Sequence, residues 1–267
     1  MKAMMVVSDP AIAAYVAAHG VDRLFVDLEW MGKAARQPGD TQKSKSGPED
    51  ISRIREAAPN AQMMVRVNPF FEGTLGEVDD AIARGADVLM LPMFRDADTV
   101  ARFQEMVAGR AAIMPLIETK AALDASAEIA ALSPDELFIG LNDLHLDMGM
   151  RFMFQPLAEG YLEAPCAALK AAGIPFGIGG IARLGQGAIP AEMVLAEHAR
   201  LGSEWVILSR GFYARAETVE ALEAMRFGDE VAKLKDAHAR LVSAGDPAGS
   251  KRAFKAAIDG FLKSQAR

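Results

Sequence analysis

The chain has 267 residues, of which 51% are hydrophobic and 24% are charged, and its formal net charge is −7. This length suits one large domain or two small ones, and the composition is sufficient for a full core. The acidic balance argues against a surface that binds nucleic acid. The single cysteine, Cys166, excludes an intrachain disulfide and an all-cysteine metal site. It lies in a helical pattern and is expected to be a small core residue.

No apolar run approaches the length of a membrane span, and Met1-Lys2-Ala3 does not open a secretory signal. We therefore expect a cytoplasmic protein in a reducing compartment, with no membrane partner and no nucleic-acid partner.

Short apolar runs alternate with helical patterns along the whole chain. The runs that predict strands are 3–7, 23–29, 62–68, 87–93, 113–118, 137–143, 175–181 and 205–209. The patterns that predict helices are 10–18, 48–58, 75–84, 98–108, 121–132, 161–172, 190–201, 218–241 (one or two helices) and 251–262. This alternation predicts an α/β fold, a (β/α)8 TIM barrel with an extra C-terminal helix. A doubly wound open sheet is the alternative.

Several of the predicted strands carry small or polar residues at alternating positions, which favours closure into a barrel. We expect a single domain over residues 1–267, with 245–267 as a helical extension. The terminal helix is expected either to pack against another subunit or to cover the bottom of the barrel. The polar stretch from Gly32 to Ser46 is long for a loop after a strand, and long loops at this end tend to be functional.

Two consecutive predicted strands each end in a carboxylate. Glu118 follows Ile-Met-Pro-Leu-Ile, and Asp143 follows Leu-Phe-Ile-Gly-Leu-Asn. Ligands bind at the carboxyl ends of parallel strands. A pair of acids there suits Mg²⁺ or Mn²⁺, which takes few protein carboxylates and keeps positions open for substrate and water. The alternative is that Glu118 caps the following helix and Asp143 begins a turn.

The alternation of side chains along a strand indicates which residues share a face. Asp27 and Glu29 share one face of the second predicted strand, and Arg66 and Asn68 share one face of the third. An arginine in an apolar run is costly to bury without an anionic partner. Arg66 is therefore expected either to pair with Asp27 or Glu29 or to hold a substrate carboxylate or enolate oxygen in the barrel mouth.

Other candidates are less specific. Arg210, at the end of the last strand, contacts substrate or is a surface cation. His145, two residues beyond Asp143, is expected to share its face and is a candidate acid or base. His19, His198 and His238 lie on helical patterns and are expected to face solvent. The glycines in the segment 177–181 suit either a backbone phosphate site or close packing inside a barrel.

Five ordered segments resemble the HpcH/HpaI aldolase and citrate lyase superfamily of metal-dependent carbon–carbon lyases. They are Phe25-Val-Asp-Leu-Glu29, Val65-Arg-Val-Asn68, Gly85-Ala-Asp-Val-Leu-Met-Leu-Pro-Met93, Pro115-Leu-Ile-Glu-Thr119 and Phe138-Ile-Gly-Leu-Asn-Asp-Leu144. The resemblance implies that Glu118 and Asp143 ligate Mg²⁺ or Mn²⁺ and that Arg66 steadies an enolate. It also implies a homo-oligomer, commonly a trimer or hexamer with the terminal helix docked between neighbours.

The expected reaction is cleavage or formation of a 2-keto-4-hydroxy acid through a pyruvate-like enolate. Arg66 and His145 are the catalytic candidates, and the expected substrate-binding residues are Asp27, Glu29, Asn68, Pro92 and Arg210. The aldolase branch usually has a histidine as base where this chain has Trp30, so a metal-bound hydroxide or His145 is considered instead. Lys33, Arg36 and Gln37 are expected either to contact substrate or to belong to a flexible, solvated loop.

The sequence leaves three alternatives to a metal-dependent aldolase. One is an acyl-CoA lyase of the citrate lyase type, although the further acid of that branch is also missing at Trp30. The others are a barrel enzyme for a phosphate ligand, built on the glycines near Gly179, and a binding protein that has lost catalysis.

Overall fold

The computed structural model describes residues 1–32, 46–244 and 247–265, with the side chains of 247 and 248 left out. The predicted loop contacts Lys33, Arg36 and Gln37 therefore lie outside the described residues. None of the described helices is both long enough and apolar enough to cross a membrane.

The core of the fold is one parallel sheet. Its strands are β1 (Lys2–Val6), β2 (Arg23–Asp27), β3 (Gln62–Arg66), β4 (Val88–Met90), β5 (Ala112–Ile113), β6 (Leu116–Ile117), β7 (Leu137–Ile139), β8 (Phe176–Ile181) and β9 (Trp205–Leu208). Their order is β5-β4-β3-β2-β1-β9-β8-β7-β6. The first strand thus lies between β2 and β9, as it does in a closed barrel rather than a doubly wound sheet.

Strands β5 and β6 are two halves of one extended segment, residues 112–117, interrupted at Met114-Pro115. The amide groups of this segment donate to carbonyls in residues 87–91, and its carbonyl groups accept from amides in residues 136–140. The segment therefore joins β4 to β7. With β5 and β6 counted as one, the nine strands form the eight-stranded barrel that the sequence predicts.

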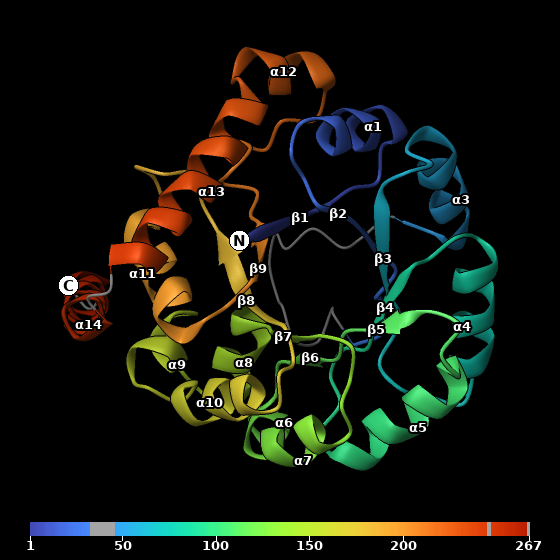
Figure 1. The fold of residues 1–267 in the computed structure, drawn as a ribbon, viewed down its shortest axis with the longest axis horizontal. Helices are drawn as coiled ribbons and strands as arrows, with labels where there is room; N and C mark the ends of the chain where they lie inside the picture. Colours follow the sequence, from blue (N-terminus) through green and yellow to red (C-terminus); the bar gives the residue numbers. More distant parts are fainter. Residues whose placement is uncertain (33–45, 245–246, 266–267) are drawn as a thin grey trace.

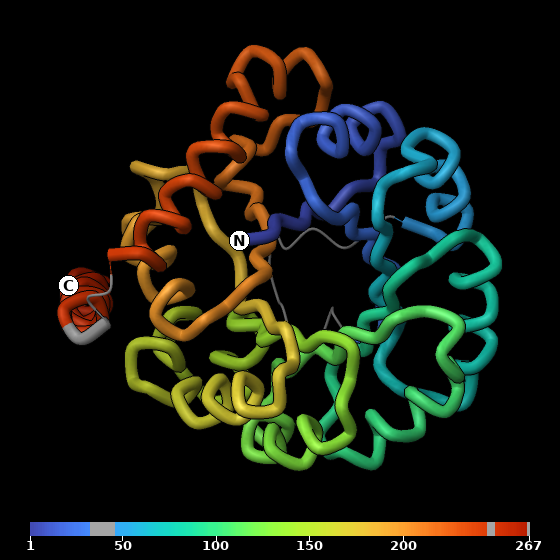
Figure 2. Tube along the Cα trace, in the orientation of Figure 1, coloured from blue at the N-terminus to red at the C-terminus, as the bar shows by residue number. Residues whose placement is uncertain are grey.

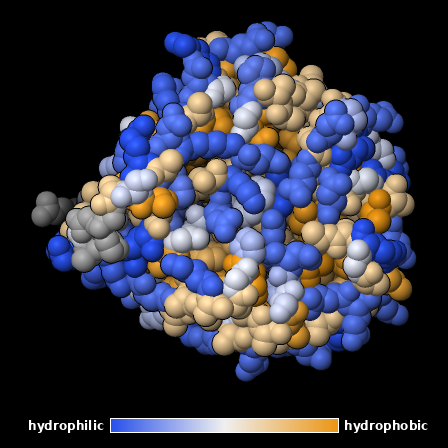
Figure 3. Space-filling view, viewed as in Figure 1, coloured by the Kyte–Doolittle hydropathy of each residue, from blue (hydrophilic) through white to orange (hydrophobic). Residues whose placement is uncertain are grey.

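Helices surround the barrel, as Figures 1 and 2 show. They are α1 (Pro10–Ala18), α3 (Pro48–Ala57), α4 (Thr74–Ala83), α5 (Ala97–Val107), α6 (Lys120–Asp124), α7 (Ser126–Ala131), α8 (Leu141–Asp147), α9 (Gln155–Ala158), α10 (Glu163–Ala171), α11 (Ala191–Leu201), α12 (Val219–Ala224), α13 (Phe227–Ala244) and α14 (Pro247–Gln265). The face seen in Figure 3 carries hydrophilic side chains over the middle of the ring.

Some predicted boundaries differ from the structure. The helix predicted over 121–132 is two short helices, α6 and α7, which meet at Ala125. The region 218–241 is two helices, separated by Arg226 in a left-handed conformation at φ 56°. The strand predicted over 137–143 ends at Ile139, and the remaining residues begin α8. This last difference changes the position of Asp143.

The interior of the barrel contains large side chains, so the expectation of small or polar inward residues is wrong for most strands. The inner cluster consists of Met4, Phe25, Met64, Val88, Met90, Met114, Leu116, Phe138 and Trp205. Methionine fills irregular gaps well because its chain is unbranched and flexible. Gly177 in strand β8 leaves room for two of these side chains, because a Cβ atom there would lie 2.3 Å from the Phe138 ring and 2.7 Å from Trp205.

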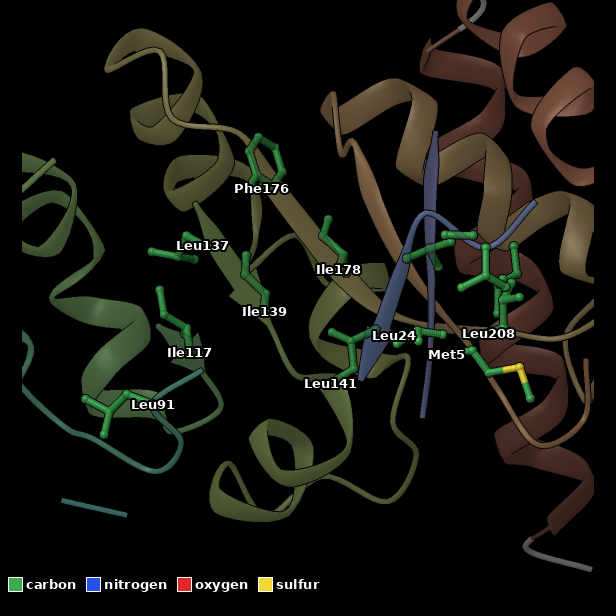
Figure 4. Packing of buried hydrophobic residues seen from close by; sticks show 14 of the residues in the cluster. Met5, Leu24, Leu91, Ile117, Leu137, Ile139, Leu141, Phe176, Ile178 and Leu208 are labelled. Atoms are coloured by element: carbon green, nitrogen blue, oxygen red, sulfur yellow. The ribbon is translucent and has the colours of Figure 1, made fainter. Parts of the chain in front are cut away.

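A second apolar layer lies between the barrel and the helices (Figure 4). Cys166 on α10 is buried there, as predicted, and burial raises the pKa of its thiol to about 12. The expectation that His198 and His238 face solvent is wrong. Both are buried, and burial lowers the pKa of His198 to about 3 and of His238 to about 4. Their helical patterns do not reveal that α11 and α13 pack against each other.

The amino-terminal end of the barrel is closed by an ion pair between the buried Arg23 and the partly buried Glu136. Arg23 is 1% exposed, and its Nη2 donates to Glu136 Oε1 over 3.0 Å while its Nε donates to Gln62 over 2.9 Å. The guanidinium also lies 3.9 Å from the centroid of the Trp205 ring. Arg23 has the same strand parity as Phe25, so its side chain points into the barrel.

The terminal helix α14 lies alongside the barrel, against α11 and α9, so it does not cover the bottom (Figure 1). Phe254 and Ile258 are each 1% exposed at this contact. Ser250 also donates a hydrogen bond to Glu197, a fully buried carboxylate on α11. The arrangement shows α14 docked on its own barrel, and docking on a neighbouring subunit stays a prediction.

Replacement of Arg23 by methionine is expected to destabilise the protein by about 3–5 kcal/mol, because it leaves the Glu136 carboxylate without its buried cation. The free energy of unfolding in urea measures the loss. Arg53→Met is the matched control, because the pair of Arg53 with Asp50 is on the surface. It is expected to cost less than about 1 kcal/mol. Equal stability of Arg23→Met and wild type would contradict the assigned role of the pair.

Candidate active site at the carboxyl end of the barrel

The site begins with an ion pair between neighbouring strands. In β2 and β3, Asp27 is the register partner of Arg66. Arg66 donates to both carboxylate oxygens of Asp27, from Nε over 2.9 Å and from Nη2 over 2.8 Å. Its Nη2 also lies 3.4 Å from Glu29 Oε2. The predicted pairing of Arg66 with these acids is therefore present.

Arg66 is held strongly in its charged form. Burial opposes its charge, but Asp27, Glu29 and Glu118 together raise the pKa of the guanidinium above its ordinary value. Glu29 is 1% exposed and Asp27 is 7% exposed, so these charges interact with little screening by water.

Glu118 lies immediately after β6 and is 2% exposed. Glu118 is separated from Leu116 and Met114 by two and four residues, so its side chain is expected on the same face of the strand. Both residues belong to the inner cluster, and this face continues into the mouth of the barrel. Oε1 accepts a hydrogen bond from the Met93 amide over 3.1 Å. Burial raises the pKa of Glu118 to about 8, with the neighbouring charges of Asp143 and Glu29 adding to the effect and Arg66 opposing it.

Met93 is a feature that the sequence did not reveal. It follows the buried Pro92 and has a φ of 57°, in the left-handed region that residues other than glycine seldom occupy. Two hydrogen bonds stabilise this turn, one from the Met93 amide to Glu118 and one from the Thr119 hydroxyl to the Phe94 carbonyl over 2.9 Å. The strained turn therefore places a donor at the Glu118 carboxylate.

Asp143 lies in the first turn of α8, not at the end of a strand. It is close enough to Glu118 for its charge to raise the pKa of that group. Gly140, which precedes α8, allows this approach. A Cβ atom there would lie 3.2 Å from Glu118 Oε2 and 3.0 Å from the Leu116 side chain.

His145 does not share a face with Asp143, because residues two apart on a helix point about 200° apart. Its Nδ1 lies 3.2 Å from the Leu141 carbonyl oxygen. Since a carbonyl only accepts, this contact favours the tautomer with hydrogen on Nδ1 and a lone pair on Nε2. The geometric premise for His145 is thus wrong, and its role as a base stays a prediction.

The structure also places the remaining substrate-binding candidates. Asn68 accepts hydrogen bonds from the amides of Trp30 and Met31 over 3.1 and 3.0 Å, and its own side-chain amide donates to Glu77. It thereby fixes the chain directly after Glu29. Arg210 is exposed beyond the end of β9. Roles of Asn68, Pro92 and Arg210 in substrate binding stay predictions.

The glycines of β8 are explained by packing. Gly177 faces Phe138 and Trp205, and Gly179, at φ 48°, would bring a Cβ atom within 2.9 Å of Leu141. These contacts account for Gly177 and Gly179 without a phosphate ligand, whereas a Cβ atom on Gly180 would make only ordinary contacts, the nearest at 3.5 Å. The packing interpretation is therefore supported for two of the three glycines of β8.

The donor set suits a hard divalent cation. Arg66 interacts with the carboxylates of Asp27, Glu29 and Glu118, and Asp143 interacts with Glu118, so the acids outnumber the one guanidinium. Among the described residues, no three acidic, histidine or cysteine side chains are gathered as a metal cluster. Mg²⁺ commonly takes one or two carboxylates and completes its shell with water and substrate, so the pair Glu118 and Asp143 fits such an ion.

A parallel barrel with an acidic, partly buried site at its carboxyl end defines a class of barrel enzymes. Within that class, the chain belongs to the HpcH/HpaI aldolase/citrate lyase family, which it matches over residues 4–176. This family is of the lyase type, acts on small keto acids and is generally dependent on divalent metal. No curated protein sequence matches the chain.

Solved structures show the same fold. A HpcH/HpaI aldolase/citrate lyase family protein from Burkholderia cenocepacia J2315 has a TM-score of 0.63 at 20% identity, over 84% of this chain and 94% of that one. The citrate synthase SbnG has a TM-score of 0.61 at 17% identity, over 85% and 94%. A HpcH/HpaI aldolase from Desulfitobacterium hafniense DCB-2 has a TM-score of 0.60 at 17% identity, over 84% and 92%.

The raised pKa of Glu118 predicts how the stability of the metal-free protein depends on pH. The folded protein retains a proton on Glu118 between the ordinary value of 4.5 and about 8. The stability that this group contributes is present below pH 4.5 and is lost as pH rises towards 8. Glu118→Gln removes this dependence, so in EDTA at pH 9 it should exceed wild type in unfolding free energy by roughly 1–3 kcal/mol.

Thermal unfolding of both proteins in EDTA between pH 6 and pH 9 provides the measurement. Glu128→Gln, on the exposed face of α7, is the control and should follow wild type at every pH. If wild type and Glu118→Gln show parallel pH dependence, the Glu118 carboxyl is not protonated in the folded protein.

Proposed function

We propose that the protein is a divalent-metal-dependent carbon–carbon lyase of the aldolase type. It cleaves or forms a 2-keto-4-hydroxy acid through a pyruvate-like enolate. The observation that carries this proposal is the buried carboxylate of Glu118, in electrostatic contact with Asp143 and beside the guanidinium of Arg66. Membership of the family supports the lyase class, and the donor set supports the metal.

Glu118 and Asp143 are the residues that would hold Mg²⁺ or Mn²⁺. When bound, the ion supplies Lewis acidity at the keto oxygen and carboxylate of the substrate. Arg66 contributes a fixed positive charge on the same side of the mouth, which is most valuable as negative charge develops on the enolate oxygen. The Asp27 carboxylate holds this guanidinium in place through two hydrogen bonds, so its position is set before substrate arrives.

The reaction also needs an acceptor for the 4-hydroxyl proton. Trp30 occupies the position at which the resemblance leads us to expect a histidine, and an indole N–H is only a donor. Its side chain is 69% exposed, whereas the amide of Trp30 is tied to Asn68. We therefore keep His145 as the candidate base in this proposal, because the contact of its Nδ1 with the Leu141 carbonyl favours the tautomer with a lone pair on Nε2.

An acyl-CoA reaction of the citrate lyase type is the second candidate. Its support is the family, which includes citrate lyases, and the likeness to a citrate synthase. Both reactions use an enolate, so the assay panel must include acyl-CoA thioesters as well as keto acids.

A trimeric or hexameric assembly in the cytoplasm also belongs to the proposal.

Glu118→Ala is expected to abolish metal-dependent pyruvate release from 2-keto-4-hydroxy acids, with a loss of at least ~100-fold in kcat/KM. Pyruvate is measured with Mg²⁺ or Mn²⁺ and again after EDTA treatment. Glu128→Ala is the control, since that exposed residue on α7 should leave the rate unchanged.

Retained activity in Glu118→Ala would rule out the assigned metal site. Turnover of acyl-CoA thioesters alone would select the second candidate. Binding of Mn²⁺ without turnover of either substrate class would show a protein that keeps the metal site and lacks catalysis.

A further inference from the structure

The position of Asp143 depends on a short helix. Helix α8 has seven residues, Leu141–Asp147, and a helix of this length is marginal without tertiary contacts. Its inner side is held by Leu141 and Leu144, which are both buried. Both leucines belong to the apolar layer around the barrel and anchor one side of the helix there. Polar contacts at the helix surface add a second constraint on the direction of Asp143.

Asp147 supplies such contacts at the end of α8. Its Oδ2 accepts a hydrogen bond from the Lys120 amide over 2.8 Å, and its Oδ1 accepts from Arg95 Nη2 over 3.1 Å. Lys120 lies two residues after Glu118, and Arg95 lies two residues after Met93, which donates to Glu118. Asp147 thus connects α8 to both segments that hold the Glu118 carboxylate.

Asp143 and Asp147 are four residues apart on the same helix, so they lie on one face about one turn from each other. The hydrogen bonds of Asp147 consequently orient the face that carries Asp143. Thr119 strengthens the same frame, because its hydroxyl donates to the Phe94 carbonyl and accepts from the Ala122 amide. The two acids are joined through this frame as well as by their charge.

We propose that Asp147 is a positioning residue, which turns Asp143 towards Glu118 and thereby sets the affinity of the site for its divalent cation. Arg95 assists by fixing the Asp147 carboxylate. This inference rests on the proposed function, because it takes Glu118 and Asp143 as the metal ligands. Partners that orient metal ligands typically alter metal affinity about 10–100-fold when they are removed.

The charge of Asp147 and its positioning role have different consequences. Asp147→Ala removes a negative charge and a positioning group, and both effects weaken cation binding. Arg95→Ala removes a positive charge, which by Coulomb attraction alone strengthens cation binding. If Arg95 acts by holding Asp147, the same variant weakens binding. The sign of the Arg95→Ala effect therefore separates the two explanations.

Binding of Mn²⁺ is measured directly, from the electron paramagnetic resonance signal of the free ion in titrations of the full-length protein. Asp147→Ala should weaken binding about 10-fold or more, and Arg95→Ala should weaken it by a smaller factor. Asp124→Ala is the matched control. Asp124 pairs with the Lys120 side chain on α6, so the variant removes one acidic charge near the same backbone and should leave the affinity unchanged. Glu118→Ala removes a proposed ligand, so the Mn²⁺ binding that this variant loses is the binding at the site.

Mn²⁺ affinity equal to wild type in Asp147→Ala would overturn the inference, and so would equal or tighter binding in Arg95→Ala. If Asp147→Ala does not fold, Asp147→Asn takes its place, because the amide oxygen still accepts from Lys120 while the pair with Arg95 is lost. Loss of Mn²⁺ affinity in Asp147→Asn supports the positioning role. Absence of Mn²⁺ binding in wild type would defeat the proposed function itself, whereas wild-type binding with unaffected variants would defeat only the role of Asp147.

Discussion

The structure of the site follows from one electrostatic constraint, the burial of Glu118 among other carboxylates. Its pKa is raised by burial and by the charges of Asp143 and Glu29, while Arg66 offsets only part of this cost. Arg66 is already engaged by Asp27, so its charge is shared between several acids. A folded chain that keeps such an imbalance holds either a proton or a cation there, because an isolated buried charge is too costly.

The interior of the barrel has three levels, and together they allow an uncompensated negative charge at the carboxyl end. At the amino-terminal end, Arg23 and Glu136 form a compensated pair. The middle is filled by methionines and aromatic rings, with Gly177 leaving room for Phe138. This apolar floor excludes water from beneath Glu118 and Arg66, and the low dielectric strengthens every charge interaction above it. The compensated ion pair at the amino-terminal end thus stabilises the fold, whereas the uncompensated carboxylates at the carboxyl end are available for chemistry.

Sequence periodicity was sufficient for the strands and their inward parity. It predicted that Arg66 pairs with Asp27 or Glu29, and Arg66 contacts both acids. The predicted position of Asp143 at a strand end is wrong because an apolar run does not show where a strand gives way to a helix, and the predicted strand 137–143 includes Gly140, which precedes α8. The spacing of Asp143 and Asp147 places them on one face only in a helix, because residues four apart are neighbours on a helix surface.

Other features were beyond the reach of local patterns. The left-handed conformation of Met93 depends on hydrogen bonds to Glu118 and Thr119, which are distant in sequence. His198 and His238 were expected at the surface because a helical pattern shows that a helix exists, but not which neighbour covers it. Their helices α11 and α13 pack against each other, a contact between segments that are distant in sequence.

The departure at Trp30 is best understood together with Asn68. The amides of Trp30 and Met31 are both bound to the Asn68 side chain, so the chain turns immediately after Glu29. This turn keeps Glu29 buried beside Arg66 and leaves the Trp30 ring exposed. The backbone geometry that follows β2 is therefore fixed by Asn68 and Glu77 and does not depend on the side chain at position 30. That independence explains how the chain accommodates a tryptophan at this position while the charged frame of Asp27, Glu29 and Arg66 stays in place.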